Sequence, residues 1–174
     1  MIGRRFNNLL APEDRGPLRV MFVHTEVVVG GAETLLLEII RKMDRRRFEP
    51  ELCCLKQLAE LGEVISKEIP TFVGLLDHKY DYKVLSRLTR LLREREIDAV
   101  VTIGTGGDRM FWGRLAAWRA GVPVILSALH ATGYPMKVER INQMLAPITD
   151  GFIGCASTHS KYLVTGENCP ADKV

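Results

Sequence analysis

Short apolar runs alternate with amphipathic stretches along this chain after Pro17. Most of these runs are continuously apolar, as expected for strands that helices cover on both faces. We predict six strands, at residues 19–24, 51–55, 71–75, 99–103, 123–128 and 151–156. Strands that alternate with helices are typical of parallel sheets with crossover connections. The pattern therefore predicts an α/β fold, a three-layer sandwich around a mostly parallel, twisted sheet.

The stretches between the strands predict helices with one apolar stripe each. Their stripes comprise Leu36, Ile39, Ile40 and Met43 in the first helix, Leu85, Leu88 and Leu92 in the second, Phe111, Leu115 and Trp118 in the third, and Val138, Ile141, Leu145 and Ile148 in the fourth. Asp81, Asp108 and Ser157 stand where the N-terminal caps of helices are expected. These helices need no functional explanation, because packing on the sheet accounts for them.

Composition restricts the class of protein further. With 174 residues, of which 47% are hydrophobic, the chain can bury the core of one domain. The net charge of +3 disfavours a nucleic-acid partner. The N-terminus holds no long apolar segment, so neither a signal peptide nor a membrane-spanning helix is predicted. We expect residues 1–17 to form a flexible leader and residues 18–174 to form the domain.

Four cysteines, Cys53, Cys54, Cys155 and Cys169, lack the paired spacing of a zinc site. The first three lie inside apolar runs, where cysteine acts as a small hydrophobic side chain. We therefore expect buried thiols, a reducing cytoplasmic setting and no bound metal.

Paired glycines join the first strand to the first helix, in the sequence Gly30-Gly31-Ala32-Glu33. Glycine tolerates a positive φ and lets a ligand approach the backbone, and the N–H groups of the following helix attract anions. Two interpretations stay open here, a phosphate-binding turn and a tight turn without a ligand. The G-x-G-x-x-G, Walker and G-x-S-x-G motifs are missing, which disfavours NAD-dependent dehydrogenases, P-loop enzymes and hydrolases of the nucleophile-elbow type.

Three loops should meet at the carboxyl edge of the sheet, at residues 25–31, 104–108 and 129–133. The second offers the Thr105 hydroxyl beside Gly106 and Gly107, although a flexible loop before a helix cap explains the same residues. In the third, His130 follows a strand, where an imidazole can bind sugar hydroxyls or a phosphate, or exchange a proton. His24 and Glu26 also fall at this edge.

The order of these motifs resembles the N-terminal domain of GT-B glycosyltransferases of the family-four, or group 1, retaining type. The matching segments are the Gly30–Glu33 turn, the step into the fifth strand at residues 121–125, His130, and residues 150–157. The resemblance spans about residues 18–174. It implies a Rossmann-like domain that forms the N-terminal half of a GT-B fold, on the acceptor side of a cleft.

The resemblance also implies an activity, the transfer of a hexosyl group with retention to a saccharide or lipid-linked acceptor. The donor would be a UDP- or GDP-sugar, used as a substrate without a cofactor or metal ion. His130 would be catalytic. The donor phosphates and acceptor would meet Gly30, Gly31, Glu33, Thr105, Gly106 and Gly107. Further acceptor contacts would come from Glu26, Thr132, Tyr134, Lys137 and Arg140, of which the last two can also meet lipid head groups.

A role in cell-envelope polysaccharide biosynthesis follows from the same resemblance, in the cytoplasm or peripherally at the inner face of the membrane. One departure is large, because the sequence stops at Val174, where the family enters its donor-binding domain. We expect this fragment alone to be inactive, since its C-terminal partner domain is absent. Two alternatives stay open, a non-catalytic Rossmann-like ligand-binding or interaction module and a relative of nucleotide-sugar epimerases.

Overall fold

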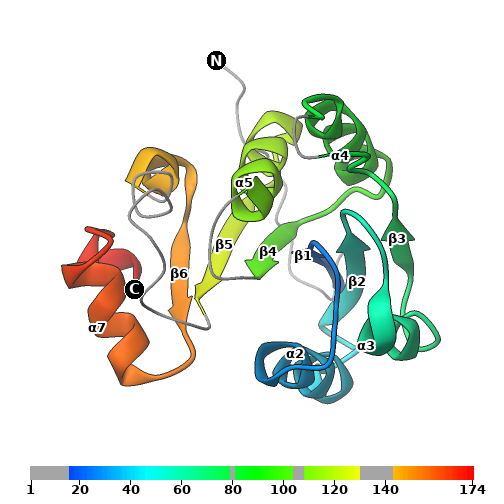
Figure 1. The fold of residues 1–174 in the computed structure, drawn as a ribbon, viewed down its shortest axis with the longest axis horizontal. Helices are drawn as coiled ribbons and strands as arrows, with labels where there is room; N and C mark the ends of the chain where they lie inside the picture. The colour runs from blue at the N-terminus through cyan, green and yellow to red at the C-terminus, as the bar shows by residue number, and fades with distance from the viewer. Residues whose placement is uncertain (1–15, 79–80, 104–107, 130–142) are drawn as a thin grey trace.

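A six-stranded sheet in the order β3-β2-β1-β4-β5-β6 forms the centre of the molecule (Figure 1). The structure is a computed structural model that describes residues 16–78, 81–103, 108–129 and 143–174. The strands are β1 (Leu18–His24), β2 (Phe48–Cys54), β3 (Thr71–Val73), β4 (Ala99–Ile103), β5 (Val124–Leu129) and β6 (Gly151–Gly154). All five pairings between them are parallel. The prediction of a parallel α/β sheet is confirmed.

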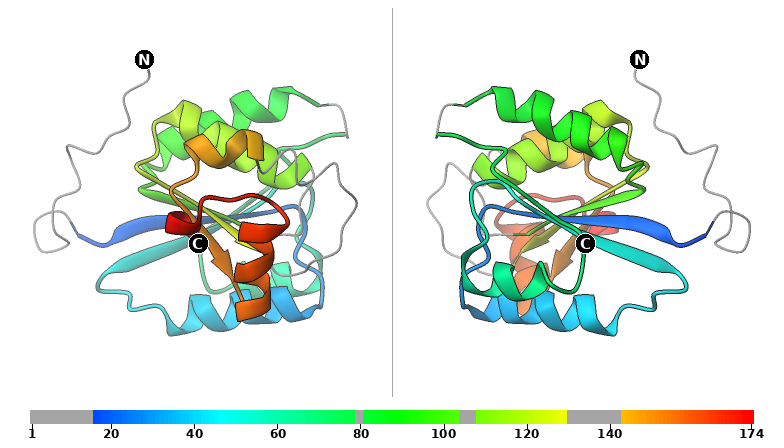
Figure 2. Two further views of the ribbon diagram at one scale, coloured as in Figure 1. Left: turned by 90° about the vertical axis from the view of Figure 1, so that its left-hand side faces the viewer. Right: turned by 90° about the vertical axis from the view of Figure 1, so that its right-hand side faces the viewer.

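Helices cover both faces of this sheet, and Figure 2 shows the three layers edge-on. The helical elements are α2 (Gly31–Lys42), α3 (Ala59–Ile65), α4 (Lys83–Glu94), α5 (Asp108–Ala120), α7 (Ser157–Thr165) and the short 3-10 helices η2 (Ala146–Ile148) and η3 (Ala171–Lys173). α4 and α5 pack on one face and α2 and α3 on the other. The three-layer sandwich is therefore confirmed as well.

Side chains of β1 alternate between two apolar cores. Met21 and Val23 pack under α4 and α5, whereas Val20 and Phe22 pack under α2 and α3. This burial on both faces explains why the strand is apolar throughout. α5 lies especially close to the sheet, because a Cβ added at Gly113 would stand 2.5 Å from the Thr102 methyl carbon.

The strand order contains one reversal, between β1 and β4. From β1 the chain builds outward through β2 and β3, and it then returns to β4 on the other side of β1. In open parallel sheets, ligands bind at the carboxyl ends of the strands beside such a reversal. The loop after β1 therefore begins at the position where a site is expected.

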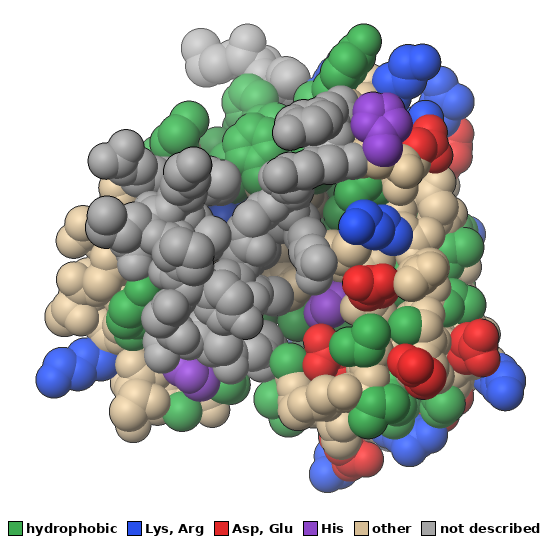
Figure 3. All heavy atoms as spheres, in the orientation of Figure 1, with side chains coloured by type: hydrophobic (Ala, Val, Ile, Leu, Met, Phe, Trp, Pro, Cys, Tyr) green, Lys and Arg blue, Asp and Glu red, His purple; other side chains and the backbone are tan. Residues whose placement is uncertain are grey.

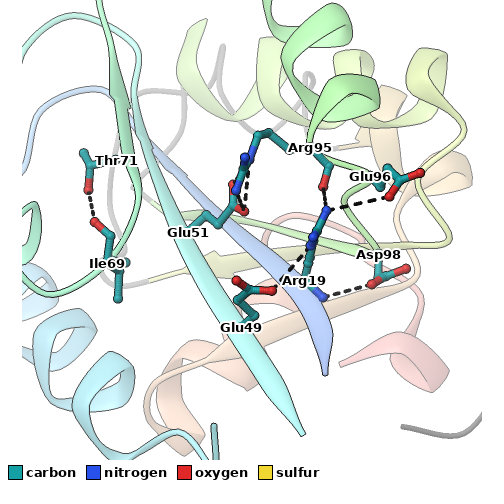
Figure 4. A network of polar contacts seen from close by, with 8 residues as sticks. All are labelled: Arg19, Glu49, Glu51, Ile69, Thr71, Arg95, Glu96 and Asp98. Atoms are coloured by element: carbon teal, nitrogen blue, oxygen red, sulfur yellow. Dashed lines mark hydrogen bonds and ion pairs between the residues drawn. The ribbon is translucent and has the colours of Figure 1, made fainter. Parts of the chain in front are cut away.

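The predicted bounds of β2 were wrong, because the strand begins at Phe48 rather than at residue 51. A charged residue, Glu51, lies wholly buried within it and receives three hydrogen bonds of 2.7–3.2 Å from the guanidinium of Arg95 (Figure 4). This pairing allows a carboxylate in the core, which an apolar pattern cannot reveal. Elsewhere β4 matches its predicted bounds, whereas β3 and β6 each end two residues early and β5 is displaced by one residue.

Some predicted core positions were also wrong. Ile39 of α2 is 42% exposed and Trp118 of α5 is 36% exposed. In α2, Leu37 is buried in place of Ile39, because the buried face of that helix consists of Leu36, Leu37 and Ile40. Cys155 is exposed, since β6 has already ended at Gly154. The prediction missed α3 entirely.

Of two predicted helix caps, the structure shows side-chain hydrogen bonds at one and none at the other. Ser157 is the first residue of α7, and no side chain caps that helix. Asp81 does cap the start of α4, since its carboxylate accepts hydrogen bonds from the backbone N–H groups of Lys83 and Asp77, both at 3.1 Å. These bonds, chiefly that from Asp77, together with an ion pair to Arg87, hold the pKa of Asp81 below its usual value.

Candidate functional site

The loop after β1 is held by backbone hydrogen bonds to the segment around α3. The Val27 N–H donates to the Leu58 carbonyl at 3.0 Å, and the Val27 carbonyl accepts from the N–H groups of Leu61 and Gly62, both at 3.1 Å. Val27 itself is fully buried. α3, which the prediction missed, thus supports the loop that leads to the paired glycines.

Gly30 differs from other residues at this turn by a close contact rather than by its backbone conformation. Its φ of −162° and ψ of 170° are extended values that any residue adopts, which corrects the expectation of a positive φ at this turn. A Cβ at Gly30 would overlap the carboxylate of Glu33. A Cβ at Gly31, in contrast, would meet nothing within 4 Å. Gly31 therefore leaves its backbone open to an approaching ligand.

Glu33 belongs to a buried pair with the last residue of β1. Its Oε1 lies 3.4 Å from Nε2 of His24, and the two side chains are only 14% and 5% exposed. The sequence placed His24 and Glu33 near the same edge but gave no sign of this contact. The pair joins the end of the strand to the first turn of α2, beneath the glycines.

The N-terminus of α2 is open. Its first intrahelical bond runs from the Thr34 N–H to the Gly30 carbonyl at 2.9 Å, and no side chain caps the helix. The N–H groups of the first helical residues thus have no acceptor among the described residues. A helix beginning with free N–H groups favours an anion, through hydrogen bonds and the helix dipole.

Two further polar groups lie in the same loop. Glu26 accepts a hydrogen bond of 2.9 Å from the Gln57 amide, which ties the carboxyl ends of β1 and β2 together. The Thr25 hydroxyl is buried, and in the described part of the chain it has no hydrogen-bond partner. Threonine at this position gave no functional signal in the sequence.

A thiol and an imidazole lie in contact at the carboxyl end of β6, away from the loop after β1. The Cys155 thiol is 2.9 Å from Nδ1 of His159, in the first turn of α7. α7 lies against the strand there, since a Cβ at Gly154 would stand 2.6 Å from the Ser160 backbone nitrogen. The prediction of a buried Cys155 concealed this contact between a thiol and an imidazole.

Of the predicted site residues, the structure describes Glu26, Gly30, Gly31 and Glu33, and all four lie in the loop after β1 or in the first turn of α2. The others, Thr105, Gly106, Gly107, His130, Thr132, Tyr134, Lys137 and Arg140, lie outside the described residues. Within the described ranges, no three His, Cys, Asp or Glu side chains are grouped to hold a metal ion. No helix in those ranges is both long and apolar enough to cross a bilayer.

The parallel sheet, its covering helices and the glycine turn at the strand reversal define a Rossmann-like domain of the GT-B class. HepE from Anabaena in complex with UDP superposes with a TM-score of 0.70 at 13% identity, over 90% of this chain and 42% of that chain. The lipopolysaccharide outer core galactosyltransferase WaaB gives 0.68 at 17% identity, over 90% and 44%. The chain thus spans less than half the length of these proteins.

The sequence itself decides the family. The family model of Glycosyltransferase Family 4 matches residues 29–174, and the chain belongs to this family. The match begins at the glycine turn and covers the N-terminal half of a GT-B fold. No curated protein matches the chain in sequence. The UDP-GlcNAc 2-epimerase from Methanocaldococcus jannaschii shares the fold too, with a TM-score of 0.59 at 11% identity over 90% of this chain and 44% of that chain.

Proposed function

We propose that this domain forms the acceptor side of a retaining glycosyltransferase that uses a nucleotide-sugar. The enzyme would move a hexosyl group to a saccharide or lipid-linked acceptor in cell-envelope polysaccharide synthesis, in the cytoplasm. The observation that carries the proposal is the uncapped N-terminus of α2 with the open backbone of Gly31 at the strand reversal. Family membership and the UDP complex of HepE support it.

The chemistry proposed for this edge is stabilisation of the leaving diphosphate. As the bond between the anomeric carbon and the diphosphate oxygen breaks, negative charge accumulates on that oxygen. Fixed N–H donors stabilise such charge without reorganising, so the free N–H groups of α2 are suited to the task without a cofactor or metal ion. The Glu33 carboxylate lies near the same turn, with its Oε1 3.4 Å from Nε2 of His24.

His130 is the proposed catalytic residue, on the basis of its place after β5 in the sequence. Contacts to the donor and acceptor are proposed for Thr105, Gly106 and Gly107, and acceptor contacts for Glu26, Thr132, Tyr134, Lys137 and Arg140. A complete GT-B enzyme has a second domain, so we propose that transfer requires a C-terminal donor-binding domain. The chain of 174 residues alone should then give no turnover.

A screen of the full-length gene product with UDP- and GDP-sugars tests the proposal. We expect transfer to a saccharide or lipid-linked acceptor, a loss of at least about 100-fold for His130→Ala, and weaker donor binding for Gly31→Val. Gly31→Ala is the matched control, because the smaller Cβ fits the open space and should change binding less. Full activity of His130→Ala and Gly31→Val would contradict the proposed site.

An epimerase is the second candidate, because two UDP-N-acetylglucosamine 2-epimerases are among the structural neighbours. The two functions differ in what they require. An epimerase would convert the nucleotide-sugar with no acceptor present, whereas a transferase would release the nucleotide only as the acceptor is consumed. The same screen, run without an acceptor, separates them.

A further inference from the structure

The contact between Cys155 and His159 joins a nucleophile to a base at the surface of the molecule. Sγ of Cys155 lies 2.9 Å from Nδ1 of His159, four residues further along the chain. The cysteine is exposed, and the histidine is half-buried in the first turn of α7. Neither side chain has a role in the site proposed at the glycine turn. The pair therefore needs an explanation of its own.

Backbone contacts hold the two side chains near each other. The end of β6 lies directly against α7, because a Cβ added at Gly154 would stand 2.6 Å from both the backbone nitrogen and the hydroxyl oxygen of Ser160. The N–H groups of His159 and Ser160 both donate to the Ala156 carbonyl, at 2.9 and 3.1 Å. The thiol and the imidazole thus come from a strand end and a helix turn that pack tightly together.

The surroundings of Cys155 can stabilise a thiolate, which is the nucleophilic form of cysteine. The imidazole of His159 can take the thiol proton and remain as a cation beside the sulfur. In α7, all of which the structure describes, no side chain caps the N-terminus and no acidic residue lies in the first turn, so the positive end of the helix dipole is not offset there. On the face drawn in Figure 3, the Asp and Glu side chains of the described residues gather at the right, mostly over α2 and α3, whereas α7 lies at the lower left.

The other three cysteines are closed to such chemistry. Cys53, Cys54 and Cys169 are buried, and burial raises the pKa of the Cys54 thiol to about 12 and that of the Cys169 thiol to about 11. All four cysteines of the chain lie among the described residues, so Cys155 has no accessible thiol in its own chain with which to form a disulfide. A sulfur that bonds to Cys155 must therefore come from another molecule.

Charge favours a small anionic partner over a second copy of the chain. The chain has a net charge of +3, and the one charged side chain of α7 is that of Lys161. Two copies that approach through this surface repel each other, whereas a disulfide that carries carboxylates is attracted. Because the strands are parallel, Cys155 lies at the same carboxyl edge of the sheet as the glycine turn, with β4 and β5 between β1 and β6 (Figure 1).

We propose that Cys155 and His159 form a thiolation site, where Cys155 exchanges reversibly with an anionic low-molecular-weight disulfide. Nδ1 of His159 takes the thiol proton, and Sγ of Cys155 attacks one sulfur of the disulfide. A new S–S bond forms as the old one breaks, and the departing thiolate receives the proton from the imidazolium. Cys155 is oxidised and the departing sulfur is reduced, so an excess of the free thiol reverses the step. This inference does not depend on the proposed sugar transfer.

Exchange of the full chain with glutathione disulfide tests the proposal. The reaction is followed by intact-mass spectrometry at neutral pH without denaturant, and peptide mapping locates the added group. The native chain should gain one glutathionyl group, at Cys155, and lose it in dithiothreitol. Cys155→Ser should gain none, because the remaining thiols are buried. The number of groups added also checks the folding of each variant, since an unfolded chain exposes all of its thiols.

His159→Gln tests the role of the imidazole. This variant should exchange about 10-fold more slowly at neutral pH, because a thiol without an adjacent base must lose its proton to solvent. For the same reason its rate should rise more steeply with pH than that of the native chain. The matched control is His78→Gln, which removes an exposed imidazole from the loop after β3, at the far end of the strand order, and should exchange at the native rate.

The proposal fails if the native chain gains no glutathionyl group, or gains it at a buried cysteine instead of Cys155. It also fails if a disulfide between two copies of the chain is the only product, or if His159→Gln keeps the native rate and pH profile. Because no sugar is transferred in this assay, its outcome is separate from that of the activity screen.

Discussion

Replacing Arg95 by methionine should destabilise the fold more than neutralising its partner Glu51. Glu51 is fully buried, whereas the side chain of Arg95 is 35% exposed. In Arg95→Met the buried Glu51 carboxylate loses its bidentate partner and cannot reach water. Breaking a buried pair in this way lowers the free energy of unfolding by about 3–5 kcal/mol. In Glu51→Gln the arginine can turn partly into solvent and keep one hydrogen bond, so we expect a loss of only about 1–2 kcal/mol.

Urea unfolding at neutral pH, followed by circular dichroism, measures both changes in the free energy of unfolding. A loss of about 3 kcal/mol should also lower Tm by roughly 6–12 °C in a domain of this size. The double variant Glu51→Met/Arg95→Met removes both charges and should lie within about 1 kcal/mol of the native protein. The reasoning is refuted if Arg95→Met costs no more than Glu51→Gln, or if the double variant is no more stable than Arg95→Met.

Three other predictions concern the site edge and the helix caps. Gly30→Ala should lower the free energy of unfolding by about 1 kcal/mol, since its Cβ displaces the end of the Glu33 side chain from its contact with His24, while Gly31→Ala should be neutral or stabilising in the same urea titration. Asp81→Asn should lower the free energy of unfolding at neutral pH. Because the native pKa of Asp81 is lowered, the difference in stability between variant and native protein should vanish as the pH falls through that pKa, below about pH 4. A stability difference that does not depend on pH would contradict the cap. Iodoacetamide followed by mass spectrometry should label Cys155 in the native state and Cys54 only after unfolding, because burial raises the pKa of the Cys54 thiol to about 12.

Much of the sheet could be predicted from the sequence, because its strands are buried on both faces. The apolar run of β4 reads directly as a strand, and Val20 to Val23 serve both cores at once. The start of β2 could not be predicted. Glu49, Pro50 and Glu51 appear polar or strand-breaking, and the burial of Glu51 depends on the guanidinium of Arg95, which is distant along the chain.

The position of the glycine turn could be predicted from the sequence, but its contacts could not. The paired glycines lie between the end of β1 and the start of α2, beside the strand reversal, and their role in a site stays a prediction. The reason for Gly30 is a side chain three residues later, and that contact exists only once α2 has formed over His24. The pairing of Cys155 with His159 was hidden in the same way, because the apolar run suggested that the strand continued past Gly154.

The reversal between β1 and β4 bears on how the chain folds. Every other strand pairing joins neighbours in chain order, whereas the Arg19 N–H donates to the Asp98 carboxylate across 79 residues. Closing that long loop costs entropy before any native contact repays it, so β1–β2–β3 and β4–β5–β6 should form first as two local units. During synthesis the first unit can assemble before β4 has left the ribosome. Docking of β4 against β1 then completes both cores, so the glycine turn forms within the first unit and the strand reversal beside it forms in the last step of folding.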